Sequence, residues 1–109
     1  MAVPTTTLTN LADAVLGAGL ATLYTAPALT TATVRSAQFC NPTAGVVSLT
    51  VVVQARSAGV ARTLVSAHPV AAGETYPGYE LLNLVLEAGG TVQASGLNLT
   101  AVLSGVEVV

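Results

Sequence analysis

The sequence carries very little charge. It contains no lysine, and its only cations are Arg35, Arg56 and Arg62. Charged residues make up 7% of the chain, whereas an ordinary soluble domain has roughly 25%. The formal net charge is −2 and there is no basic run. Because binding to a phosphate backbone requires clustered Lys and Arg, we expect no direct nucleic-acid partner.

Signals for a membrane or for export are also missing. No apolar run reaches the roughly 18 residues that indicate a spanning helix. The opening segment MAVPTTTLTN lacks the basic region that begins a secretory signal peptide. We therefore expect neither a membrane partner nor a secretory leader.

Residues that carry chemistry are equally scarce, since Cys40, His68 and Asp13 are the single Cys, His and Asp. One cysteine excludes an internal disulfide. Ser66 lies two residues before His68, but the only Asp is distant in sequence, so a catalytic triad is not indicated. Cys40 and His68 could be neighbours across strands, yet the further ligands of a zinc site are missing.

The remaining polar residues do not indicate an enzyme either. Glu74, Glu80, Glu87 and Glu107 adjoin turns or the end of the chain, where solvated carboxylates are common, rather than forming an obvious glycosidase pair. Gly89–Gly90 follows a strand-like run but lacks the wider pattern of a phosphate-binding loop. We expect a protein that is not an enzyme and has no catalytic residues, cofactor or metal.

The chain is instead rich in uncharged residues, and hydrophobic residues make up 52% of its length. Trp is absent and there is one Phe, so a core must be built from Val, Leu and Ala. Such a chain stays soluble by covering itself with Thr, Ser, Asn and Gln, or by hiding surface against copies of itself or a partner. We expect an obligate assembly.

From residue 20 onward the pattern is that of short β-strands. The run VVSLTVVVQA places Val47, Leu49, Val51 and Val53 on one face, and the segment after residue 96 alternates apolar and polar positions. Turn signals recur about every ten residues. The sequence predicts a single all-β domain over 20–109, a jelly-roll-like β-sandwich or a barrel of about seven to eight short antiparallel strands.

Residues 1–19 differ and are predicted to form an N-terminal arm. The arm is either extended or carries one or two helical turns after Asn10. It packs on its own domain or docks on a neighbouring subunit, by adding a strand to an exposed edge or by lying in a groove. The apolar residues that we expect at an interface in or next to this arm are Val3, Leu8, Leu11, Val15, Leu20 and Tyr24.

The segment ETYPGYE, residues 74–80, places Tyr76 and Tyr79 around a Pro-Gly turn. Two tyrosines on a turn can anchor a protein interface or stack on a sugar. Alternatively, the rings cover the end of the sandwich. Both tyrosines are candidate interface residues.

Four short motifs resemble a set of small proteins encoded among the structural genes of tailed bacteriophages. In chain order they are ATLYTAP, TVRSAQFCN, LEAGGTVQAS and LSGVEV, and the resemblance covers roughly residues 20–108. The shared order is Tyr-Thr-x-Pro, a strand with xVRSxxxxN, a hydrophobic strand, an LEAGDT-like turn and a final SGxE. One departure is Gly90, where an Asp is more usual in the turn.

The resemblance implies a virion structural protein, made in the cytoplasm of a host bacterium and located at the capsid surface. A head decoration (cement) protein is the first expectation, acting as a homotrimer at junctions between major capsid subunits. The alternative is a tail-, neck- or fibre-associated β-sandwich module that binds another virion protein or host carbohydrate.

Overall fold

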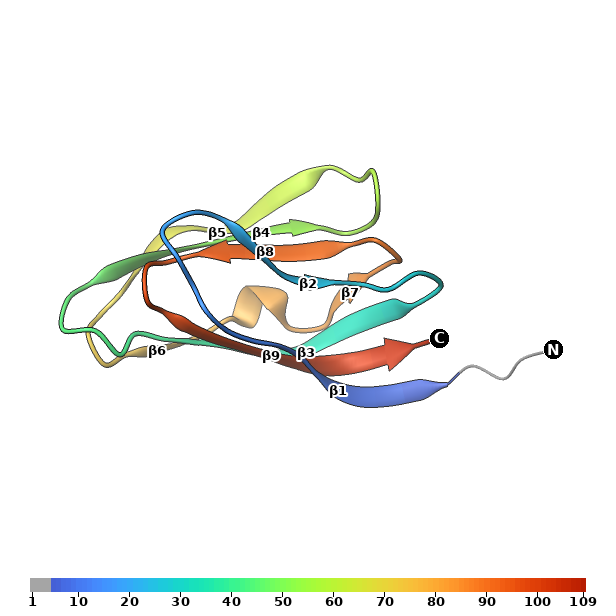
Figure 1. Ribbon diagram of the computed structural model, residues 1–109, viewed down its shortest axis with the longest axis horizontal. Coiled ribbons are helices and arrows are strands. Elements are labelled where there is room, and N and C mark those ends of the chain that lie inside the picture. Colours follow the sequence, from blue (N-terminus) through green and yellow to red (C-terminus); the bar gives the residue numbers. More distant parts are fainter. Residues whose placement is uncertain (1–4) are drawn as a thin grey trace.

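The computed structural model describes residues 5–109 (Figure 1). Apart from one short 3-10 helix, its elements are all β-strands. In chain order the elements are β1 (Thr6–Val15), β2 (Ala21–Thr25), β3 (Thr31–Cys40), β4 (Val47–Gln54), β5 (Ala61–Val70), β6 (Thr75–Pro77), the 3-10 helix η1 (Tyr79–Leu81), β7 (Leu84–Leu86), β8 (Thr91–Ser95) and β9 (Thr100–Val108).

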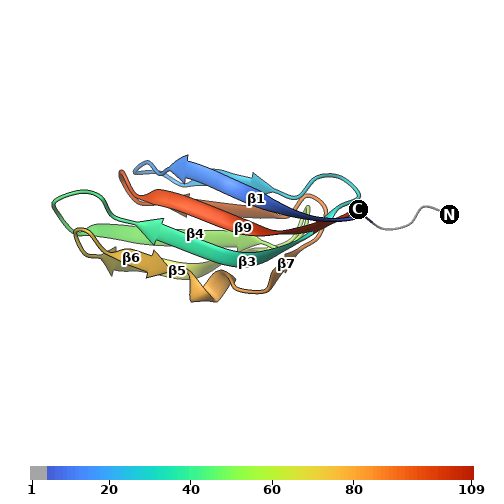
Figure 2. The ribbon, with the colours of Figure 1, turned by 90° about the horizontal axis from the view of Figure 1, so that it is seen from below.

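The strands form two antiparallel sheets that lie one above the other (Figures 1 and 2). The first sheet has the order β1-β9-β3, with β6 and β7 both paired to the far edge of β3. The second sheet has the order β2-β8-β4-β5. This confirms the predicted β-sandwich, and within residues 5–109 the sheets do not close into a barrel.

The strand order is that of a jelly roll. The first four strands alternate between the sheets, β4 and β5 are neighbours in the second sheet, and β9 and β8 insert beside β1 and β2. The fourth strand of the first sheet is interrupted, so β6 and β7 take the place of one strand. Between them the chain leaves the sheet through η1, and it returns where the Asn83 N–H donates to the Val34 carbonyl at 2.7 Å.

The core lies between the sheets and is made almost wholly of Val, Leu and Ala, as predicted. Of the residues predicted on one face of β4, Leu49, Val51 and Val53 are buried and Val47 is half-buried. On β9, whose alternation was predicted, Ala101 and Leu103 are buried. The single Phe is fully buried at position 39. Strand formation follows from β-branched residues at alternate positions, each of which packs one side chain inward.

A buried asparagine joins the loops at one end of the sandwich. The Asn41 side-chain amide donates to the carbonyls of Gly45 (2.7 Å) and Val70 (2.8 Å). Its Oδ1 accepts from both the backbone N–H (2.9 Å) and the hydroxyl (2.6 Å) of Thr43. Because every polar atom of this side chain has a partner, its burial is stabilising rather than costly.

The segment that was predicted as an arm contains a regular strand. Residues 6–15 form β1, which pairs along its length with β9 of the same chain. The helical turns considered after Asn10 are absent from the described residues. The alternation of side chains across the pair outweighs the weak helical spacing, because Leu11 and Ala12 reach the core at a β-bulge. Val3 lies outside the described residues.

Candidate interaction surfaces

The outer face of the first sheet is broad and exposes apolar side chains. Residues directly opposite one another in an antiparallel pair share a face, and one such row crosses the sheet through Leu8, Val106, Thr33 and Val85. Leu8 is 82% exposed and Val85 is 49% exposed. We call this surface the apolar face.

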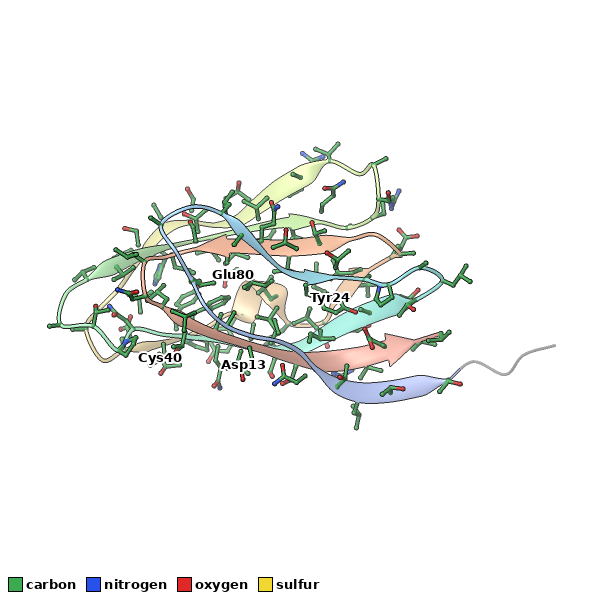
Figure 3. All side chains as sticks on the ribbon, in the orientation of Figure 1. Asp13, Tyr24, Cys40 and Glu80 are labelled. Carbon is green, nitrogen blue, oxygen red and sulfur yellow. The ribbon has the colours of Figure 1, made fainter. Side chains whose placement is uncertain are left out.

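A second row of the apolar face contains an acidic side chain. The row runs from Asp13 on β1 through Val102 to Gln38 on β3. Figure 3 shows Asp13 on this sheet. Val102 is 41% exposed, between the buried Ala101 and Leu103. Its neighbours across the sheet depend on the register of the strands.

The outer face of the second sheet has a different chemistry. One row crosses it through Thr22, Gln93, Val52 and Thr63, and another through Thr25, Thr91, Gln54 and Ala61. The Gln93 amide donates to the Thr22 hydroxyl at 3.3 Å. These rows hold hydroxyl and amide groups without a charge, and we call this surface the hydroxyl face.

A hydrogen bond joins the two sheets on the side of β1 and β2. The Tyr24 hydroxyl donates to Glu107 Oε2 at 2.5 Å. Glu107 lies opposite the buried Ala32 and therefore points inward from β9. Burial, aided by the bond to Glu107, raises the pKa of Tyr24 well above its usual value. Tyr24 is labelled in Figure 3.

The opposite side of the sandwich is closed at one end by a different tyrosine. The rings of Tyr76 on β6 and His68 on β5 pack with centroids 4.4 Å apart. The Tyr76 hydroxyl donates to Glu80, with oxygen–oxygen distances of 2.6 and 2.7 Å. Burial, with this bond, raises the pKa of Tyr76 to about 12. Beside them Leu81 of η1 is fully buried and fills the space between the sheets.

Tyr79 faces solvent rather than Tyr76. It is 71% exposed and borders a surface hollow of 250 Å³ whose lining includes Ser36, Gln38 and Leu82. The structure therefore separates the two predicted tyrosines. Tyr76 is half-buried and packed against its own chain, as in the alternative in which the ring covers the end of the sandwich, and Tyr79 remains available to a partner.

The other predicted interface residues divide in the same way. Leu8, Val15 and Leu20 are exposed, whereas Leu11 packs into the core of its own chain and Tyr24 is half-buried. The structure brings Leu8 and Val15 onto the apolar face, both from β1. Whether these residues form an interface between chains stays a prediction.

The residues considered for chemistry are not assembled into a site. Cys40 pairs with Thr75 and Thr100 in the first sheet, whereas His68 pairs with Leu49 in the second. A bulge in β5 between Val65 and His68 breaks the alternation that placed Ser66 and His68 on one face.

Each of the four glutamates forms a hydrogen bond or an ion pair within the chain. Glu80 and Glu107 accept from tyrosines, Glu87 pairs with Arg56 at 2.9 Å, and Glu74 accepts from the Ala71 N–H at 3.3 Å. Among residues 5–109 there is no group of three metal-ligating side chains. The same part of the chain has no helix with the length and hydrophobicity needed to cross a membrane.

The motifs that carried the resemblance are joined in space by structural contacts. Tyr24 of the first motif is bonded to Glu107 of the last, 83 residues away. The turn of the third motif is bonded to the first, since the Ala26 N–H donates to the Gly90 carbonyl at 2.8 Å. Asn41, the last residue of the second motif, is the buried side chain that hydrogen-bonds the loops at one end of the sandwich.

The glycines of these motifs are required by close packing. A Cβ at Gly90 would lie 2.7 Å from the Ala55 carbonyl oxygen, and one at Gly105 would lie 2.1 Å from that of Thr33. An Asp at position 90 would therefore require the neighbouring backbone of Ala55 to move. In this chain the four motifs contribute contacts that hold the sandwich together.

The fold and these surfaces define a jelly-roll β-sandwich with two largely uncharged outer faces. No known family matches the chain, and no curated protein does. A solved structure described as that of infectious bursal disease virus, Gx strain, is similar with a TM-score of 0.49 and 16% sequence identity. The match covers 97% of this chain and 31% of the other, so this chain spans about a third of that one. Such a distant match does not indicate a shared function.

Proposed function

We propose that this protein is a structural component of a virus particle, and specifically a decoration protein of a tailed-bacteriophage head. The carrying observation is a jelly roll whose two outer faces are almost without charge, one of them apolar. Jelly rolls of this kind occur in viral capsid domains, although the fold also serves lectins and enzymes. The motif resemblance to phage structural proteins favours the virion among these.

The proposed mechanism is burial of the apolar face at junctions between major capsid subunits. Removing apolar surface from water stabilises an assembly by roughly 25 cal/mol per Å², and a specific interface covers about 800 Å² on each partner. Leu8, Val85 and Val102 supply apolar contacts across three strands of that face. Three copies around a three-fold junction would form the homotrimer. In each copy, β1 is the edge strand of the first sheet.

Light scattering across a dilution series tests the oligomeric part of this proposal. We expect a trimer that persists on dilution, because a chain with so little charge stays soluble by covering part of its surface against copies of itself. A monomer at every concentration would reject the trimer in solution. It would leave binding to the capsid as a separate question.

Co-sedimentation with capsids lacking the protein tests the capsid part. Leu8→Asn, placed on the apolar face, should weaken attachment at least tenfold while leaving the melting temperature within a few degrees. The matched control is Thr63→Asn on the hydroxyl face, which should attach like the native protein. Equal attachment of both variants, or no attachment of the native protein, would contradict the decoration role.

The second candidate is a tail-, neck- or fibre-associated module, favoured by the exposed Tyr79 beside its hollow. An aromatic ring next to Ser36 and Gln38 offers stacking and hydrogen bonding to a sugar. Tyr79→Ala should then abolish binding to host cells without changing the melting temperature. Unchanged cell binding would remove this candidate.

A further inference from the structure

The sandwich has an apolar cleft on the side of β5 and β7, away from the end that Tyr76 and Leu81 close. Its volume is 320 Å³. The apolar lining includes Val53, Leu64 and Leu84, contributed by both sheets, and Arg56 and Arg62 also border it. Two of the three cations in the chain therefore lie at one opening.

The two arginines differ in their partners. Arg56 forms an ion pair with Glu87, at 2.9 Å. Arg62 lies opposite the buried Val53 in the β4–β5 pair and is exposed at the opening of the cleft. Among the described residues Arg62 has no ion pair. The cleft thus combines an apolar lining with one exposed guanidinium that pairs with no described carboxylate.

The strand edge beside the cleft is also available. β5 is the outer strand of the second sheet, and no described strand pairs with its far edge. Its second half is unsuited to pairing, because Ala67 has a left-handed backbone (φ 47°) and Pro69 lacks an N–H. A further register shift lies between Thr63 and Val65, so the uninterrupted part of the free edge is residues 61–63, whose outward N–H and C=O groups form a short template for another strand.

We propose that this cleft binds an extended segment of a partner protein, which pairs with residues 61–63 of β5. The segment places a carboxylate beside Arg62 and an apolar side chain, two residues away, between Leu64 and Leu84. In an added strand, residues i and i+2 face the same side, so one segment satisfies both requirements. The inference applies to any partner polypeptide and does not depend on the capsid role.

Charge complementarity and shape together select the occupant. A cation at the cleft favours an acidic partner, and a chain whose net charge is −2 repels acidic partners elsewhere. A strand edge recognises a polypeptide backbone through repeated hydrogen bonds, which a small anion cannot form. A fatty carboxylate would satisfy only Arg62 and the apolar lining.

The test is a ¹⁵N NMR titration of the full chain with three blocked peptides of sequence Thr-Leu-Thr-X-Thr, where X is Glu, Gln or Lys. We expect the Glu peptide to shift the amides of residues 61–63 and 84, with the Gln peptide about three- to fivefold weaker and the Lys peptide weaker still. Octanoate is the fourth probe and should not protect the β5 amides from hydrogen exchange.

Matched variants assign the effect to one side chain. Arg62→Gln should remove the preference for Glu over Gln, whereas Arg35→Gln, an arginine on β3, should retain it. Equal binding of the Glu and Lys peptides, shifts confined to other strands, or octanoate reproducing every shift would overturn the proposal. The proposal would also be overturned if the native chain bound no peptide and Arg62→Leu self-associated. Arg62 would then serve to prevent other strands from pairing with the β5 edge.

Discussion

The two lateral sides of the sandwich place a charged side chain in different surroundings. On the β1–β2 side, Glu107 points inward and accepts a hydrogen bond from Tyr24 of the other sheet. On the β5–β7 side, Arg62 is exposed at the opening of the cleft and has no ion pair among the described residues. A charge requires a partner or water, so the hydrogen bond of Glu107 joins the two sheets on the first side, whereas the charge of Arg62 on the second side is open to solvent.

The comparison separates residues that maintain the fold from those that are available for binding. Tyr24 and Glu107 both belong to the four sequence motifs, and their contact is internal. Arg62, Val85 and Val102 lie outside these motifs and face a cleft or solvent. Variants on the side bridged by Tyr24 and Glu107 should therefore change stability, and variants at the opening beside Arg62 should change binding.

The largest effect is expected at Gly105, on the bridged side. An added Cβ would lie 2.1 Å from the Thr33 oxygen and 2.9 Å from Leu11 Cδ1, so β1, β3 and β9 would have to separate. Gly105→Ala should lower the free energy of unfolding by about 4 kcal/mol, measured by urea denaturation. Gly19→Ala is the control, because nothing lies within 4 Å of its added Cβ. A small loss at Gly105 would contradict the register of the first sheet.

The second-largest loss of stability is expected at Leu81, at the end of the β5–β7 side that Tyr76 and η1 close. Leu81 is fully buried, whereas its neighbour Leu82 is 41% exposed. Leu81→Ala should cost about 3 kcal/mol through the cavity that it leaves, and Leu82→Ala well under 1 kcal/mol. Thermal and urea denaturation of the pair measure the difference. Equal losses would mean that η1 does not fill the space between the sheets.

A smaller effect is expected from the bond that joins the sheets on the bridged side. Tyr24→Phe keeps the ring but removes the hydroxyl that donates to Glu107. Loss of a hydrogen bond to a charged group costs about 1–2 kcal/mol. Double-mutant analysis with Glu107→Gln should show that the two substitutions are not additive. Strict additivity would argue against the contact.

The stability of the protein at alkaline pH should reveal the environment of Tyr76. Folding raises the pKa of Tyr76 to about 12, from an ordinary value near 10. Because the unfolded chain then loses the proton first, stability is unaffected below pH 10 and declines as the pH rises toward 12. Tyr76→Phe should flatten this decline. Parallel curves for the native and Tyr76→Phe proteins would mean that folding does not raise the pKa of Tyr76.

Much of the fold could be predicted from local patterns. The faces of β4 and β9 followed from strict alternation, and the Val-Leu-Ala core followed from the lack of aromatics. The arm could not be assigned, because residues 6–15 have a pattern compatible with an exposed strand or a short helix. Only pairing with β9, which is about 95 residues away in the chain, decides between them.

The candidate surfaces were less predictable than the fold. Leu8, Val15 and Tyr79 were selected from the sequence and are exposed, but Leu11 shares their apolar character and is buried by a bulge. Arg62 offered no signal, since an exposed lone arginine after a hairpin is common on protein surfaces. Its position at the cleft depends on the pairing with Val53, and that pairing follows two register shifts along β4 and β5.

The sequence by itself determined an all-β fold with little charge, and left a sandwich and a barrel both open, because alternation and composition act through neighbouring residues. The tertiary structure alone decided which side chains meet: Tyr24 with Glu107, Tyr76 with His68, and the opening beside Arg62. These contacts join residues far apart in the chain. Their existence depends on bulges and strand order, which no local pattern specifies.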